Sequence, residues 1–266
     1  MRTILYTLLC LIGFLIHDLV CAQEISKDSL IHELTKLPDD SSKVKVYIEL
    51  ARTYYESTDY KKSKAYVDTA LELAEDINFK PGIIDYYSIN GRILKNTGKF
   101  VEAKYEYYKA LALSVQINDS NRIGSSYNNL GNLAINTHDY KEAKCFLDTS
   151  VMIFTKIGNT KKLAYPLSNM GKIFLDQKLY DSALCYFNKT IQLAKQHNDL
   201  YELAQSLKRM ASIYAQMIDY PKAFAYCDSA LMISEKNNYR YIVADICEIQ
   251  AKIYLDKGTI KVLEKN

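Results

Sequence analysis

Residues 127–154 read YNNLGNLAINTHDYKEAKCFLDTSVMIF, and this stretch decides the fold. It holds two runs with apolar residues at helical spacing, and the polar THDY between them predicts a turn. Gly131 precedes the aromatic Tyr140 by nine residues, and Ala143 follows it by three. Small residues at matching heights let two helix axes approach closely, and an aromatic side chain fills the wedge at the turn. The stretch therefore predicts a pair of antiparallel helices.

The pattern recurs every 40 residues through most of the chain. The aromatic position is occupied by Tyr60, Phe100, Tyr140, Tyr180 and Tyr220. The small position nine residues earlier is occupied by Ala51, Gly91, Gly131, Gly171 and Ala211. Five units in one register, without an insertion, predict a stacked array of helix pairs. Composition agrees, because only 9 Gly and 4 Pro in 266 residues are too few for an all-β fold, and 48% hydrophobic residues exclude disorder.

These residues resemble the tetratricopeptide repeat family. That family places Leu-Gly and Tyr on its first helix and Ala, a large apolar residue and Ala on its second, as 127–154 and 207–234 do here. The period of 40 exceeds the usual length of about 34, and the Pro that ends each family unit is absent. Such longer repeats are similar to those of bacterial peptide-sensing regulators and kinesin light chains. The resemblance implies an all-α, right-handed superhelical solenoid.

The expected architecture is five full repeats, a truncated sixth and an extra N-terminal helix. We expect the repeat domain over 44–266, with units near 44–83, 84–123, 124–163, 164–203 and 204–243 and a partial unit at 244–266. First helices are predicted at 44–57, 83–97, 123–137, 163–177, 201–217 and 241–257. Second helices are predicted at 61–78, 101–117, 141–157, 181–197 and 221–237. Residues 23–43 supply a helix at 25–36 and a linker, and that helix is expected to cover the first unit.

The first 22 residues have the pattern of an export signal. Arg2 precedes an uncharged, mostly apolar run over residues 4–16, and Val20-Cys21-Ala22 fits a cleavage site. The run is too short for a comfortable membrane span. We expect a periplasmic or secreted bacterial protein; the alternatives are an uncleaved N-terminal anchor and, less well supported, a lipoprotein modified at Cys21.

Four cysteines follow the signal, and we expect free, half-buried thiols. Cys145 and Cys185 lie 40 residues apart, which places them at equivalent points of stacked units, around 10 Å from each other and too far for a disulfide. Cys227 with Cys247 is the pair to test.

Motifs for catalysis are missing, so we expect no enzyme, no cofactor and no metal. The sequence contains no HExxH, Walker loop, GxSxG or nucleotide-binding glycine fingerprint. A net charge of +3 is too small to indicate a nucleic-acid partner.

In the resembled family, the concave groove is lined by first-helix residues around the small position. The corresponding residues here are Arg52, Arg92, Asn128, Asn129, Asn132, Asn169, Lys172, Lys208 and Arg209. They predict a basic, amide-rich groove for an extended peptide or an acidic tail, with no aromatic stacking platform. Two alternatives are an ordinary solvated face and, for Asn129 and Asn169, bonds between units. Among 23 tyrosines, Tyr55, Tyr105 and Tyr108 fit the core pattern less well and are candidate surface contacts.

The favoured function is an exported, non-enzymatic scaffold that binds a peptide or protein segment. The alternative is a sensory input module of a signal-transduction kinase or regulator, which the downstream gene sequence would reveal; an envelope assembly factor is a third class. Gly258 aligns with Gly98 at a helix-to-helix turn, with only KVLEKN beyond the turn. We therefore expect an uncovered apolar face on the helix at 241–257, used for self-association or continued in a longer parent chain.

Overall fold

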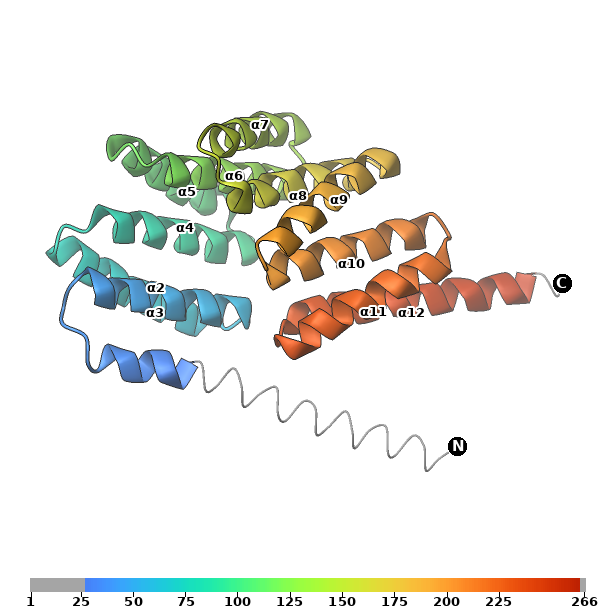
Figure 1. The fold of residues 1–266 in the computed structure, drawn as a ribbon, viewed down its shortest axis with the longest axis horizontal. Coiled ribbons are helices and arrows are strands. Elements are labelled where there is room, and N and C mark those ends of the chain that lie inside the picture. Colours follow the sequence, from blue (N-terminus) through green and yellow to red (C-terminus); the bar gives the residue numbers. More distant parts are fainter. Residues whose placement is uncertain (1–26, 264–266) are drawn as a thin grey trace, which may run out of the picture.

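The computed structural model describes residues 27–263, with side chains described to residue 257, and its architecture is an all-α solenoid of helix pairs (Figure 1). After a helical segment at residues 27–34, the chain forms α2 Ser41–Glu56, α3 Tyr60–Asp76, α4 Lys80–Asn96, α5 Phe100–Gln116, α6 Ser120–Asn136, α7 Tyr140–Lys156, α8 Thr160–Asp176, α9 Tyr180–Gln196, α10 Leu200–Gln216, α11 Tyr220–Lys236 and α12 Arg240–Leu263. The predicted fold class is confirmed. The signal-peptide prediction for residues 1–22 lies outside the described residues.

The 40-residue period consists of two equal halves. Each helix from α3 to α11 has 17 residues and is followed by a turn of three. The middle residue of each turn has a positive φ, at Thr58, Asn78, Gly98, Asn118, His138, Gly158, Lys178, Asn198, Ile218 and Asn238. The first helices from α4 to α10 consequently begin one to three residues earlier than predicted, because the turns between units are as short as those within them.

Each turn joins a helix end to the start of the next helix by local hydrogen bonds. The N–H of Asp139 donates to the carbonyl of Ala134 at 2.9 Å, which ends α6 with a left-handed residue at His138. The Asp139 carboxylate then accepts from the N–H of Glu142 and caps α7. Asp or Asn caps recur before α3, α6, α8, α10 and α11. Such turns keep every pair antiparallel.

Close contact between paired helices depends on complementary residue sizes. Gly131 of α6 lies against Leu147 of α7, and Gly91 lies against Tyr107 in the preceding unit. Where the small residue is Ala51 or Ala211, the residue sixteen positions later is the smaller Val67 or Cys227. The core is thus a series of small clusters, one at each crossing.

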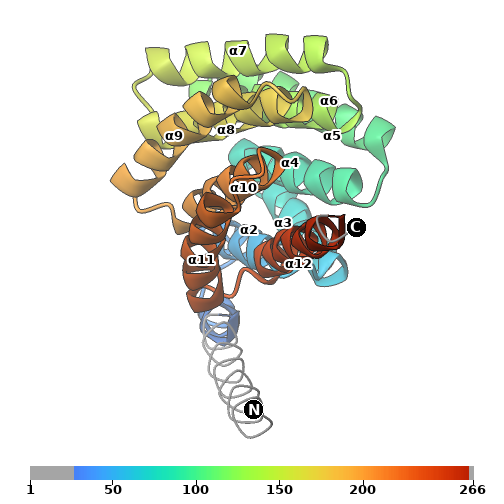
Figure 2. The ribbon, with the colours of Figure 1, turned by 90° about the vertical axis from the view of Figure 1, so that its right-hand side faces the viewer.

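The units stack with their first helices on the inside of a curve. In Figure 2, α6, α8 and α10 lie inside α7, α9 and α11. At the N-terminal end, Leu30, Leu34 and Leu37 pack against Val46 and Leu50 of α2, so the extra segment covers the first unit as expected.

The truncated sixth unit differs from its prediction. α12 continues without a turn through Gly258 to Leu263, so the expected helix-to-helix turn there is wrong. The aromatic that anchors each turn is replaced by Ile260, and the chain has too few further residues to pack a second helix against α12. Tyr254 is exposed, as expected for a helix without a second-helix partner.

The four described cysteines are free thiols. Cys145, Cys185 and Cys247 are exposed and Cys227 is buried, so the expectation that all would be half-buried is wrong. The first three lie on outer faces of their helices, whereas Cys227 occupies the crossing position against Ala211.

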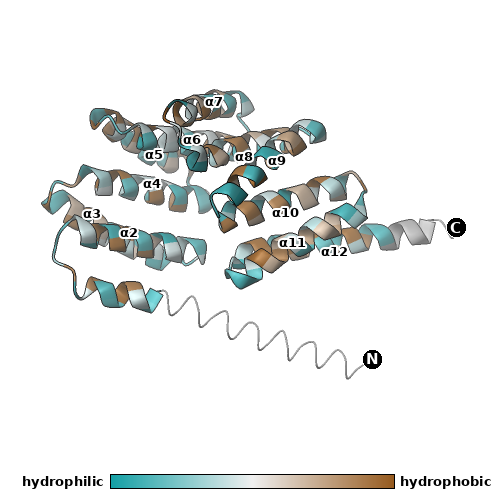
Figure 3. Ribbon diagram, viewed as in Figure 1, coloured by the Kyte–Doolittle hydropathy of each residue, from teal (hydrophilic) through white to brown (hydrophobic). Residues whose placement is uncertain are grey.

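Hydropathy alternates along the helices (Figure 3). Within residues 27–263, none of the helices combines the length and apolar character that a membrane crossing requires.

Candidate functional site

The candidate site lies along the inner helices α4, α6, α8 and α10. Side chains spaced three or four residues apart share one face of a helix, and the predicted groove residues follow this spacing. Consecutive inner helices are neighbours, so a side chain on one reaches the equivalent turn of the next. The groove therefore carries polar contacts that run from unit to unit.

An amide ladder joins three inner helices. Asn132 of α6 donates to Asn169 of α8 at 2.9 Å, and Asn169 donates back to Asn128 of α6 at 2.9 Å. Lys95 of α4 donates its Nζ hydrogen to the Asn132 carbonyl oxygen. Asn169 thus bonds between units, which was one of the alternatives for its role. Asn129 is half-buried beside this ladder and takes no part in it.

Cations crowd the same part of the groove. The Arg92 guanidinium lies 4.1 Å from the centre of the Tyr55 ring, and Lys172 donates to Asn136 at 3.3 Å. Burial lowers the pKa of Lys95 to about 7, and repulsion from Arg92, Lys172 and Arg209 adds to the shift. Burial and Arg209 also lower the pKa of Lys172. Cations from α4, α8 and α10 therefore act on one another across the groove.

The α10 end of the cluster is partly neutralised. Lys208 pairs with Asp245 of α12 at 2.6 Å, and Arg209 donates to the Ser168 hydroxyl at 2.6 Å. Glu202 is buried 3.9 Å from Arg209, and burial raises its pKa while Arg209 opposes the rise. Carboxylates therefore balance this end more than the Lys95 region.

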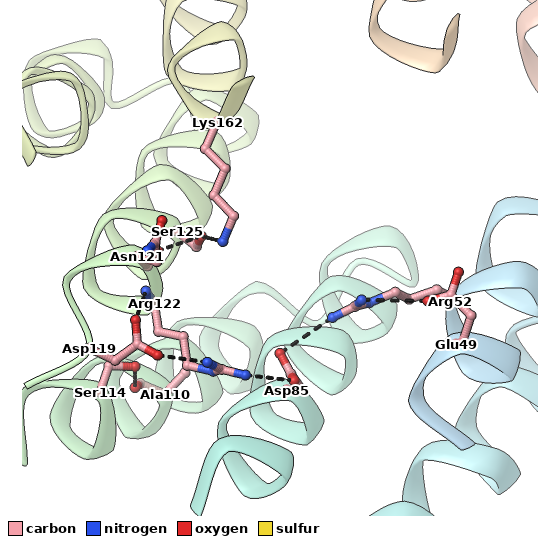
Figure 4. Close-up of polar contacts among 10 residues, drawn as sticks. All are labelled: Glu49, Arg52, Asp85, Ala110, Ser114, Asp119, Asn121, Arg122, Ser125 and Lys162. Carbon is pink, nitrogen blue, oxygen red and sulfur yellow. Dashed lines mark hydrogen bonds and ion pairs between the residues drawn. The ribbon is translucent and has the colours of Figure 1, made fainter. Parts of the chain in front are cut away.

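Arg52 belongs to a separate network near the starts of the inner helices (Figure 4). Arg52 of α2 and Arg122 of α6 approach Asp85 of α4 from opposite sides, at 3.4 and 3.2 Å. Arg122 also pairs with Asp119 at 2.6 Å. The network links three units, so Arg52 contributes to stacking as well as to the groove surface.

Tyrosines correct the expectation that the groove lacks aromatic side chains. Tyr201 lies 6.1 Å from Tyr241 and 5.3 Å from Tyr239, measured between ring centres, and Tyr165 donates to Asp199 at 2.7 Å. Sequence analysis considered only the groove face within three residues of the small position. Following that face two further turns toward the helix start would have identified Tyr165 and Tyr201.

The groove can bind an anionic, extended ligand. Arg and Lys hold carboxylates, and each amide of the ladder retains hydrogen-bonding capacity for a peptide backbone. Within the described part of the chain, no three His, Cys, Asp or Glu side chains gather as a metal would require.

Comparisons with known proteins follow from this geometry. A family model described as soluble NSF attachment protein, SNAP, matches residues 82–247, and a tetratricopeptide repeat model matches residues 44–77. No curated protein sequence matches the chain.

Three solved structures illustrate the similarity of fold. BtubC (BKLC) from P. vanneervenii is 17% identical, with a TM-score of 0.54 over 84% of this chain and 92% of that one. A Rap protein complexed with competence and sporulation factor is 18% identical, with a TM-score of 0.62 over 86% and 74%. The signal-transduction ATPase PH0952 from Pyrococcus horikoshii, which has a tetratricopeptide repeat sensor, is 18% identical, with a TM-score of 0.55 over 94% and 43%. At these identities the likeness establishes the fold alone.

Proposed function

The chain belongs to the soluble NSF attachment protein family and is a tetratricopeptide-like helical scaffold, and we propose that it holds an acidic peptide or protein segment in its concave groove without catalysing a reaction. One observation carries this proposal: Arg92, Lys95, Lys172 and Arg209 crowd together strongly enough to bring the pKa of Lys95 to about 7. An acidic ligand would relieve that repulsion. A Rap protein of similar fold, complexed with competence and sporulation factor, is a precedent for binding by such an array.

The proposal explains why amides and cations occur together. Carboxylates of the ligand would pair with the cations, while its backbone would bond to Asn128, Asn132 and Asn169. Asn is a poor helix former, so its repeated use in the middle of α6 and α8 has a cost that binding would offset. A ladder serving stability alone would be insensitive to the charge of any added peptide.

A binding assay with a defined probe tests the groove. We would measure fluorescence anisotropy of a labelled ten-residue glutamate peptide against the chain, with a glutamine peptide as the uncharged control. The Arg92→Gln/Asn132→Ala/Lys172→Gln variant should bind the glutamate peptide at least tenfold more weakly. The matched control, Lys61→Gln/Lys141→Gln, removes two exposed charges from outer helices and should bind normally. Equal affinity for the groove variant, with intact helicity, contradicts the proposal.

Export is the second part of the proposal, and it rests on the signal-like first 22 residues. Amino-terminal sequencing of the protein from a periplasmic or secreted fraction should begin at Gln23. A chain that retains Met1 in a membrane fraction would support the uncleaved anchor instead.

A sensory role is the second candidate. The similar fold of PH0952, which has a tetratricopeptide repeat sensor, favours it. The gene sequence downstream of residue 266 distinguishes it, since a sensor of this kind is followed by a membrane helix and an output domain.

Self-association through α12 is a further part of the proposed partner set. Tyr254 and Ala251 are exposed on this helix. A Tyr254→Asp variant should lower the dimer fraction in sedimentation if this surface is used.

A further inference from the structure

α5 carries a continuous apolar stripe on its outer face. Val101, Tyr105, Tyr108 and Val115 are 82%, 63%, 42% and 53% exposed, and Ala112 between them is also exposed. Their spacings of four, three, four and three residues place all five on one face of the helix. α5 belongs to the outer layer of the solenoid (Figure 2), so this face points away from the groove. Scattered exposed apolar residues are ordinary, but a row along a whole helix marks an interaction surface.

The repeat supplies an internal comparison. The residue equivalent to Tyr108 is polar in each of the other second helices: Asp68, Asp148, Asn188 and Asp228. The residue equivalent to Val115 is Glu75, Thr155, Lys195 or Glu235. The solenoid therefore folds with polar residues at these positions, and α5 alone replaces them with Tyr and Val.

The core does not account for the stripe. The opposite face of α5 supplies the packing through Ala103, Tyr107, Ala110 and Ser114, all of which are buried. Exposed Tyr and Val side chains gain little stability until another surface covers them. The stripe is thus suited to a partner outside the chain.

The 4-3 spacing is the seam of a two-stranded helical coil, in which apolar residues alternate at these intervals. We propose that α5 pairs with α5 of a second copy of this chain, antiparallel about a two-fold axis that passes between Tyr105 and Tyr108. In that arrangement Tyr105 of one copy packs on Tyr108 of the other, and the bulkier Val101 packs on the small Ala112. Such an interface is self-complementary, as a two-fold dimer requires.

Charge selects the antiparallel direction. Glu102 follows Val101 and Lys109 follows Tyr108, so both flank the seam on the same side. Antiparallel pairing places each Glu102 near Lys109 of the second copy, which creates two opposite-charge pairs. Parallel pairing would instead place Lys104 near Lys109 of the second copy, a like-charge contact. The dimer would leave both concave grooves open, so that two ligand segments on one partner gain from being held together.

Sedimentation velocity of the full chain over about 1–100 µM tests the proposal. The wild type should change from monomer to dimer with concentration. Tyr108→Asp introduces the residue found at three of the equivalent positions, so it should fold normally and weaken dimerisation at least tenfold. Met152→Asp changes another exposed apolar residue on an outer helix and should leave the dimer intact.

Charge exchange tests the orientation. Glu102→Lys and Lys109→Glu should each weaken self-association, because each creates two like-charge pairs, and a mixture of the two variants should recover a dimer through mixed pairs. A wild type that stays monomeric throughout overturns the proposal and assigns the stripe to another protein. Retention of the dimer in Tyr108→Asp, or its loss in Tyr254→Asp alone, also overturns it and points to α12.

Discussion

Replacing Gly131 with alanine tests how the paired helices reach their close approach. An added Cβ would lie 2.7 Å from both Cγ and Cδ2 of Leu147 and 3.3 Å from the Ala143 carbonyl oxygen. Leu147 is fully buried, so its side chain has little room to move. Overpacking of this kind costs about 1–3 kcal/mol. Alanine also favours a helix interior over glycine by about 1 kcal/mol. Gly131→Ala should therefore destabilise the fold by about 1 kcal/mol.

The sign should reverse when Leu147 is shortened. Leu147→Ala alone leaves a cavity and should cost about 2–5 kcal/mol. In that background the atoms 2.7 Å from the new Cβ are gone, so Gly131→Ala should stabilise the fold by about 1 kcal/mol. The two changes would then be coupled by about 2 kcal/mol, as neighbouring residues in contact commonly are.

Urea unfolding followed by circular dichroism measures these differences. Midpoints are comparable only where the urea dependence of the free energy is unchanged, because repeat arrays can unfold in parts. Ala65→Gly, on the exposed face of α3, calibrates the intrinsic difference between alanine and glycine. If Gly131→Ala stabilises the wild-type background by as much as that calibration, close approach does not require glycine and the reasoning is refuted.

Three further predictions concern the turns, the groove and the thiols. Ile218→Gly should stabilise the fold by about 0.5–1 kcal/mol in urea unfolding, because Ile218 is exposed at φ 63° and a left-handed residue with a side chain costs roughly 1–2 kcal/mol. Stability should rise from pH 7 to 9, since the unfolded chain binds more protons at Lys95 than the folded chain, whose pKa there is about 7; a Lys95→Met variant should show a smaller rise in its urea midpoint. A maleimide reagent should label the native thiols of Cys145, Cys185 and Cys247 rapidly, and label Cys227 only on unfolding, because Cys227 is buried and burial raises its pKa to about 11; rapid labelling of all four in the native state would contradict its burial.

The helix pairs were predictable because their determinants are local. Gly131 and Tyr140 mark a crossing and a turn through residue size alone, and the period transfers that reading to the other units. The first-helix starts were placed late because the turns between units lack the aromatic signal of those within them. Their signal lies in Asn78, Asn118, Gly158 and Asn198, residue types that tolerate a positive φ.

The groove could be predicted only in part. The spacing of Asn132 and Lys172 identifies a shared face, because a helix fixes which residues lie above one another. The mutual repulsion of Lys95 and Arg209 could not be predicted, because these residues lie three units apart and approach through curvature accumulated over several crossings. Each crossing angle depends on details of packing that one-dimensional spacing does not contain.

The repeat itself separates the requirements of folding from those of function. Every second helix must bury the same face, and Ala103, Ala143, Ala183 and Ala223 satisfy that demand identically. At an exposed position, folding makes no such demand, so a residue that departs from its equivalents needs a reason other than stability. Tyr108, among aspartates and an asparagine, departs in this way on the outer face, and the Asn128–Asn132–Asn169 ladder does so on the inner face. A single globular domain offers no such comparison, because none of its positions has an equivalent. Here four neighbouring helices act as controls for the fifth, which is why the α5 stripe can be assigned to an interaction rather than to chance.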